Sequence, residues 1–277
     1  MCRMQHDPTT MERIEAGLRA TASFARDVTR VPGFLVAIAP GSATGLAVAV
    51  PDGVEAADLG AALADVEAVF GRRGVAPAIE YLEERHPDLA AAAHARGWRT
   101  AMTAPVMVST DGDVVAPQRD HATSVLFPHG DDVATLEAYL RGQSRAYGGD
   151  GGDGALAWLP VLRAGLAAGT IVVAALTADD RVVAGASVQI GAGVGELAGV
   201  WTLPEVWRRG HAGAACAAAL QRVLPLQLSF CWLSAAPGAT GLYERLGFRR
   251  VATQRNLAGP LPEGSSVGPP SGARALS

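Results

Sequence analysis

Apolar residues recur along the chain with two spacings, one typical of helices and the other of strands. Spacings of three and four residues predict helices over 10–29, 56–73, 88–96, 131–143, 155–168, 210–224 and 240–246. Short apolar runs predict strands over 33–39, 45–50, 76–83, 100–109, 171–176, 182–190, 196–203, 226–234 and 248–256. The alternation predicts an α/β fold with a mixed (α+β) sheet. Strands 196–203 and 226–234 flank a helix, so we expect them to be parallel.

The two halves of the chain resemble each other when one is shifted by 150 residues without gaps. The shift that places Gly60 on Gly210 also places Gly97 on Gly247, and the predicted strands and helices coincide. A match of this kind indicates duplication. We therefore predict two domains, 1–110 and 120–256, joined by a linker that begins near 110. Residues 257–277 are rich in Gly, Pro and Ser, which predicts a disordered tail.

Composition narrows the classes of function. Hydrophobic residues make up 49% of the 277 residues, which is enough for sizeable cores, and the net charge of −4 argues against general binding to nucleic acid or anionic membranes. No apolar stretch approaches the length of a membrane span, and "MCRMQHDPTT" has no signal core. The three cysteines are far apart and show no zinc spacing, so we expect no metal and a cytoplasmic location.

The stretch "WRRGHAGAAC" (207–216) places two arginines and several small residues where a strand turns into a helix. The first N–H groups of a helix lack internal partners, and the helix dipole adds positive charge there. Small residues from Gly210 onward let a bulky anion approach the backbone, and Arg208 and Arg209 add charged donors. The pattern fits a pyrophosphate, but it also fits an ordinary corner with two solvated arginines.

The surrounding segment favours the first alternative. "TLPEVWRRGHAGAACAAAL" resembles the coenzyme A pyrophosphate loop of the GCN5-related N-acetyltransferases (GNAT), whose pattern is Arg/Gln-x-x-Gly-x-Gly/Ala. Gly210 and Ala212 match that pattern, whereas Trp207 stands where Arg or Gln is usual. "TADDRVVAGASVQI", with Gly185, and "GLYERLGFRRV" (241–251) resemble two further elements of the family, so the resemblance covers about residues 125–256 in the right order.

The resemblance implies acetyl-CoA as acyl-donor cosubstrate. Backbone groups of Val200 and Thr202 would bond the pantetheine arm between two diverging parallel strands, and the loop would hold the pyrophosphate. The positions assigned to coenzyme binding are Val200, Trp201, Thr202, Arg208, Arg209, Gly210, His211, Ala212 and Gly213. Of these, His211 is expected to be a solvated residue at the helix start rather than a base.

The resemblance also assigns catalytic roles. Tyr243 matches the tyrosine that protonates the leaving thiolate; the alternative is a tyrosine packed on the core. Glu196 matches a position where several members carry a general base; the alternative is a water-exposed carboxylate at a strand edge. Four residues near "GGDGGDG" (148–154) are candidates for acceptor contacts, although that segment also reads as a flexible loop: Tyr147, Asp150, Asp153 and Trp158.

The first half lacks the same chemistry. The shift places Asp58 where Arg208 stands and Ala93 where Tyr243 stands, and Asp52 and Glu55 add negative charge to that corner. The sequence therefore predicts tandem GNAT folds: a degenerate first lobe, and a second that transfers an acetyl group to a primary amine of a small molecule or peptide. The alternatives are an idle acyl-CoA-binding regulatory module and a two-lobe structural scaffold.

Overall fold

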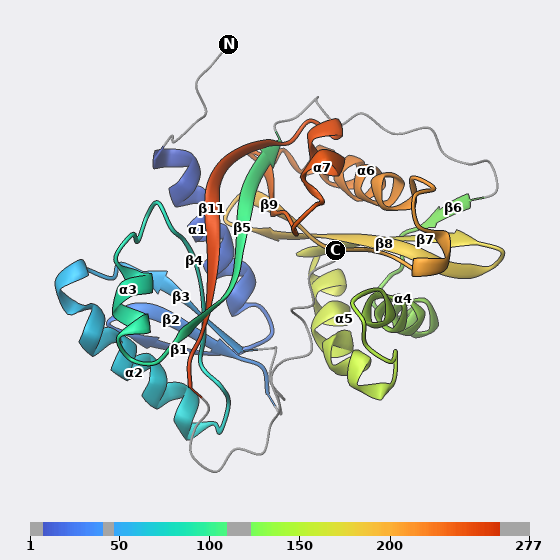
Figure 1. The fold of residues 1–277 in the computed structure, drawn as a ribbon. Coiled ribbons are helices and arrows are strands. Elements are labelled where there is room, and N and C mark those ends of the chain that lie inside the picture. Colours follow the sequence, from blue (N-terminus) through green and yellow to red (C-terminus); the bar gives the residue numbers. More distant parts are fainter. Residues whose placement is uncertain (1–7, 41–46, 110–122, 261–277) are drawn as a thin grey trace. The chain divides into compact units, whose positions relative to one another are not determined.

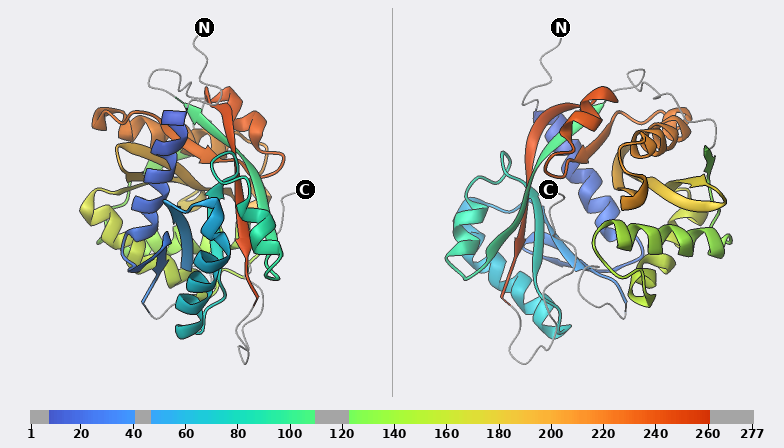
Figure 2. Two further views of the ribbon diagram at one scale, coloured as in Figure 1. Left: turned by 90° about the vertical axis from the view of Figure 1, so that its left-hand side faces the viewer. Right: turned by 45° about the vertical axis from the view of Figure 1, so that its right-hand side comes forward.

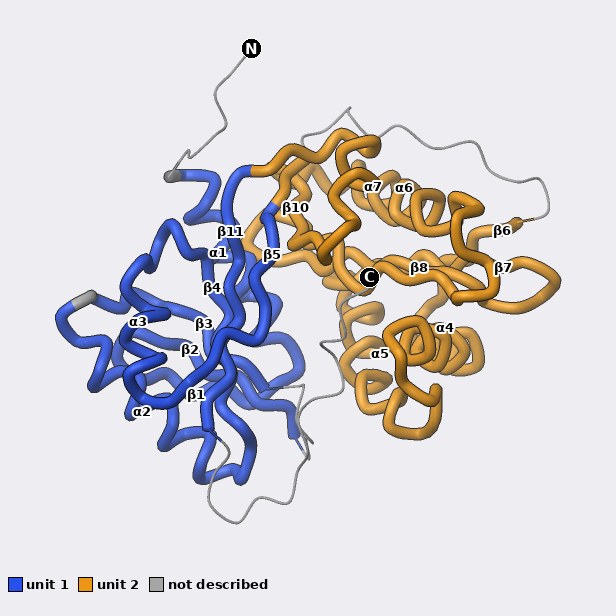
Figure 3. Tube along the Cα trace, viewed as in Figure 1, with its two compact units in different colours: residues 1–106, 251–273 blue, residues 107–250, 274–277 orange. Residues whose placement is uncertain are grey.

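A computed structural model describes residues 8–40, 47–109 and 123–260. The described residues divide into two compact units (Figure 3): those before Met107 and those from Val251 onward form unit 1, and those of Met107–Arg250 form unit 2. The expected linker and the expected tail from 261 onward lie outside the described residues. The start of the tail predicted over 257–277 is not disordered: the last strand runs to Ala258, and Leu257 is buried in an apolar core.

Unit 1 is a sheet with helices on both faces. Its elements are α1 (Pro8–Ser23), β1 (Asp27–Val31), β2 (Gly33–Ile38), β3 (Ala47–Asp52), η1 (Ala56–Asp58), α2 (Leu59–Arg72), β4 (Ala78–Leu82), α3 (Leu89–His94), β5 (Arg99–Ser109) and β11 (Arg249–Ala258). Its strands follow the order β1-β2-β3-β4-β11-β5. The apolar side chains of α2 and α3 pack on one face of this sheet, and α1 covers the other (Figure 1).

Unit 2 has the same kind of architecture. Its elements are β6 (Thr123–Leu126), α4 (Val133–Ala146), η2 (Asp153–Trp158), α5 (Leu159–Ala168), β7 (Ile171–Ala178), β8 (Arg181–Gly191), β9 (Val194–Thr202), η3 (Pro204–Val206), α6 (His211–Val223), η4 (Leu224–Leu226), β10 (Cys231–Ser234) and α7 (Thr240–Arg245). The strand order is β10-β9-β8-β7-β6. Helices α6 and α7 cover one face and α4 and α5 the other (Figures 1 and 2).

Two local features shape this sheet around β7 and β8. Asp179 and Asp180 both have positive φ, as a two-residue hairpin turn requires, so β7 and β8 pair as the sequence predicted. On the α6 face, side chains from Ala214 to Leu220 are all buried, because a run of small residues lets the helix lie close to β7 and β8. The predicted parallel pairing of β9 and β10 is confirmed.

Two predicted elements are clearly shorter in the structure, and two strands were not predicted. The helix predicted over 10–29 ends at Ser23, because the chain turns at Ala25 (φ 54°) and enters β1. The strand predicted over 226–234 begins only at Cys231, since Pro225 and the left-handed Gln227 form a short 3-10 turn instead. Strands β1 and β6 were not predicted.

The duplication is visible in the order of elements, but the last strand is not where the repeat would put it. Strand β5 begins at Arg99 and β11 at Arg249, two residues that the 150-residue shift superposes. Yet β11 pairs antiparallel with β4, with Leu257 opposite Ile79, so its residues from Val251 belong to unit 1. The sequence had placed this strand in the second domain.

No helix in the described ranges is long and apolar enough to cross a membrane.

Candidate coenzyme and acyl-transfer site

Strand β9 is paired differently along its two edges. Its edge toward β8 stays paired as far as Thr202, whereas β10 is registered only with Gly195 and Glu196. After Glu196 the second edge of β9 is therefore open. A bulge falls in this open half, because the register with β8 shifts and Gly199 has φ 59°, a backbone conformation that favours glycine.

The bulge is held from the α4 face by side-chain donors. The carbonyl of Gly199 accepts from Gln143 Nε2 at 3.2 Å and from Tyr139 Oη at 3.4 Å. The carbonyl of Ala198 accepts from Ser187 Oγ at 3.1 Å. The sequence did not single out Tyr139, Gln143 or Ser187, because nothing in helical or strand periodicity marks a donor that bonds a distant carbonyl.

The loop before α6 exposes the backbone that an anion needs. Gly210 is the N-cap of α6 with φ 80°, and no side chain caps the helix. Arg208 is also left-handed (φ 63°), an uncommon conformation for a residue with a side chain. Both Arg208 and Arg209 are exposed, and neither has an ion-pair partner among the described residues. The corner therefore presents N–H groups and two cations to solvent.

The residues that follow are more buried than the sequence suggested. His211 is only 6% exposed, so the expectation of a solvated residue is wrong: its side chain packs into the protein at the first turn of α6. Ala212 is half-buried and Gly213 is buried.

The two catalytic candidates lie on different elements of unit 2, Tyr243 on α7 and Glu196 on β9. Tyr243, on α7, is 7% exposed and packs edge-to-face against Phe248, with ring centroids 6.2 Å apart. Burial raises the pKa of Tyr243 far above its ordinary value, and Cys216 and Tyr147 add to the shift. Glu196 is half-buried at the last position where β9 and β10 are paired, so it does not stand at a water-exposed strand edge.

Residues 136–248, which contain this site, match the family model described as the acetyltransferase (GNAT) family. This segment belongs to the GNAT family. Most of unit 2 is therefore a GNAT domain, and the matched segment includes the loop before α6, the β7–β8 hairpin and α7, on which the resemblance rested. No curated protein sequence matches the chain.

Solved structures extend the likeness of the GNAT domain to the whole chain. A GCN5-related N-acetyltransferase from Kribbella flavida is 24% identical, with a TM-score of 0.74 over 90% of this chain and 95% of that one. One from Sphaerobacter thermophilus is 16% identical, with a TM-score of 0.60 over 85% and 82%. A tandem GNAT protein from the clavulanic acid biosynthesis pathway is 14% identical, with a TM-score of 0.54 over 92% and 97%. The fold is thus a tandem of GNAT folds.

The structure brings one of the four acceptor candidates of the GNAT domain to β9. Tyr147, at the end of α4, donates from Oη to the carbonyl of Val200 at 3.0 Å. Asp150 instead accepts from the N–H of Gly152 in its own turn, and Asp153, 95% exposed, pairs with Arg141 at 2.8 Å. Trp158 packs against the apolar core under α5.

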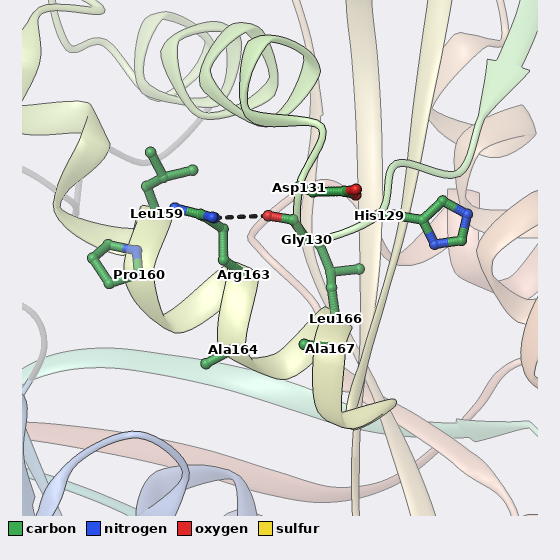
Figure 4. A pocket seen from close by; sticks show the side chains of 9 residues that line it. All are labelled: His129, Gly130, Asp131, Leu159, Pro160, Arg163, Ala164, Leu166 and Ala167. Carbon is green, nitrogen blue, oxygen red and sulfur yellow. Dashed lines mark hydrogen bonds between the residues drawn. The ribbon is translucent and has the colours of Figure 1, made fainter.

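A surface cavity of about 760 Å³ lies elsewhere in the GNAT domain, between α5 and the loop before α4 (Figure 4). His129, Asp131 and Arg163 supply its polar groups, and Arg163 Nε donates to the carbonyl of Gly130 at 2.7 Å. No predicted site residue lines it. Across 8–40, 47–109 and 123–260, no group of three His, Cys, Asp or Glu side chains is arranged to hold a metal ion.

Proposed function

We propose that the GNAT domain transfers an acetyl group from acetyl-CoA to a primary amine of a small molecule or peptide. The observation that carries this proposal is the open edge of β9 beside the uncapped N-terminus of α6. The extended pantetheine arm would lie along the open edge of β9, and the pyrophosphate would lie at the N-terminus of α6. The hydroxyl oxygen of Thr202 supports the fit: it is buried on β9 and has no hydrogen-bond partner among the described residues.

The loop residues divide the work of holding the coenzyme. Backbone N–H groups in the first turn of α6, which helix geometry leaves without partners inside the helix, would bond phosphate oxygens, and Arg208 and Arg209 would neutralise their charge. Both guanidinium groups are exposed, so their contribution is screened by salt. Trp207 brings no charge, and its indole Nε1 instead donates to the carbonyl of Thr202 at 2.8 Å.

The catalytic candidates fit the proton movements of acyl transfer. The acceptor must lose an ammonium proton before its nitrogen attacks the thioester carbonyl, and we propose that Glu196 takes it, directly or through water. The thiolate that leaves must gain a proton. The hydroxyl of Tyr243 is protonated at neutral pH even at its ordinary pKa and can supply one, although the burial that raises this pKa also makes the hydroxyl a weaker acid.

Unit 1 lacks the groups for a second coenzyme. At the corner equivalent to Gly210, α2 begins after Glu55 and Asp58, which are both exposed. Asp52 does not add to this corner as the sequence suggested, because its carboxylate is paired with Arg19 and Arg30. Two carboxylates without a cation still oppose a pyrophosphate, so we place one coenzyme per chain, in the GNAT domain.

An acceptor-amine screen that follows thiol release from acetyl-CoA tests the proposal. We expect turnover with at least one class of small-molecule or peptide amines. Coenzyme A binding without turnover on any amine would favour an idle regulatory module. Absence of both binding and thermal stabilisation by coenzyme A would favour a structural scaffold and refute the proposal.

A further inference from the structure

Two exposed aromatic residues bond alternate carbonyls on the open edge of β9. Trp207 is 48% exposed and donates from Nε1 to Thr202, and Tyr147 is 38% exposed and donates from Oη to Val200. Large apolar side chains this exposed are uncommon in the described part of the chain. Both aromatics are held by their single polar group, one from the loop before α6 and the other from the end of α4.

The two carbonyls form one row on β9. The N–H of Leu203 donates to Val183 on β8, so by strand alternation the carbonyl of Thr202 points away from β8. Val200 lies two residues earlier on the same edge, and residues two apart on a strand are separated by about 6.6 Å. An added strand would place its own N–H donors on such a row, and here two side chains occupy the positions of those donors.

We propose that Trp207 and Tyr147 are competing donors on this row, which the amide N–H groups of an extended ligand replace: one amide takes the place of the indole on the Thr202 carbonyl, and the other takes the place of the phenol on the Val200 carbonyl. This inference rests on the proposed function, which supplies the ligand class. The pantetheine half of coenzyme A is an extended chain with two secondary amides, whereas its nucleotide half has none.

Exchange of donors has a measurable consequence. A ligand amide that displaces an indole or phenol gains one hydrogen bond and costs another, so the wild type gains little from that contact. A phenylalanine at either position leaves the carbonyl bonded only to water. A ligand amide then gains the net free energy of its hydrogen bond to that carbonyl, because no protein hydrogen bond is broken. The net free energy of one such hydrogen bond corresponds to about two- to tenfold in affinity.

Calorimetry on Trp207→Phe and Tyr147→Phe tests the inference with three probes: coenzyme A, 4′-phosphopantetheine and adenosine 3′,5′-bisphosphate. Both variants should bind the first two about two- to tenfold more tightly than the wild type and bind the bisphosphate equally well. Tyr139→Phe is the matched control, because its hydroxyl bonds the bulge carbonyl of Gly199 from the buried face. It should leave all three affinities unchanged.

Three results would contradict the inference, and they are distinguishable. Unchanged or weaker binding of 4′-phosphopantetheine by both variants would show that the aromatics support the arm rather than yield to it. An equal change in bisphosphate affinity would show that the substitutions act through the loop. A wild type that binds none of the probes would refute the proposed function itself, and the inference with it.

Discussion

Gln254 of β11 lies opposite Leu82 of β4 in an antiparallel pair that anchors the end of the described chain in unit 1. Polar contacts reinforce this pairing. Gln254 Nε2 donates to Glu80, and the N–H of Thr253 donates to Glu84 at 2.9 Å. Strand β11 is thus an internal strand of the unit 1 sheet, although it follows the GNAT domain in sequence.

Truncation after Arg250 should therefore destabilise unit 1 rather than trim a terminus. Without β11, strand β4 loses its antiparallel partner and buried Leu257 leaves the apolar core. We expect hydrogen exchange in β2, β3 and β4 to lose protection. Truncation after Pro260 is the matched control and should preserve it. Equal protection of unit 1 in both truncations would contradict the role assigned to β11.

Glu80 makes part of this anchor dependent on pH. Desolvation raises the pKa of its carboxyl above the ordinary 4.5, although Arg26 and Gln254 oppose the shift. The Glu80 carboxyl therefore ionises more readily in the unfolded chain than in the folded one. As pH rises above 4.5, the free energy of unfolding of the wild type falls, whereas that of Glu80→Gln lacks this contribution. The melting temperature of Glu80→Gln relative to the wild type should rise between acid and neutral pH. A constant or falling difference would show that the carboxylate is stabilised where it lies.

The sequence predicted most elements of the fold because their periodicity is local. It assigned the strand over 248–256 to the second domain, whereas β11 pairs with β4 of unit 1, because periodicity does not encode pairings such as that of Gln254 with Leu82. At the site, glycines and arginines in one short segment marked the loop at Gly210. The bonds of Tyr147 and Trp207 to β9 escaped notice, because they link residues through the fold rather than through a motif.

Gly210→Glu should abolish coenzyme A binding. It adds bulk and negative charge where phosphate oxygens approach, at a position whose φ of 80° already disfavours a side chain. Gly60→Glu, at the equivalent corner of unit 1, is the matched control and should bind normally. Arg208→Glu combined with Arg209→Glu should weaken binding, and the loss should shrink as salt is added. Unchanged affinity in the folded variants would remove the pyrophosphate from this loop.

Tyr243→Phe should lower turnover by roughly ten- to a thousandfold, the range for a lost acid catalyst, and leave coenzyme A affinity nearly intact. The substitution removes one hydroxyl and preserves the edge-to-face contact with Phe248. Tyr81→Phe, which removes a buried hydroxyl from unit 1, controls for general effects on stability. Steady-state kinetics with saturating acetyl-CoA provides the comparison. Turnover equal to that of the wild type would leave Tyr243 as a packing residue.

The central claim is that the GNAT domain binds one coenzyme and unit 1 binds none. The stoichiometry of coenzyme A binding tests this claim most directly. Calorimetric titration of the full chain should saturate at one coenzyme per chain, and Gly210→Glu should reduce it to none. Saturation near two per chain, or one remaining site in Gly210→Glu, would show that the corner at Gly60 binds the coenzyme despite Glu55 and Asp58, and would contradict the account.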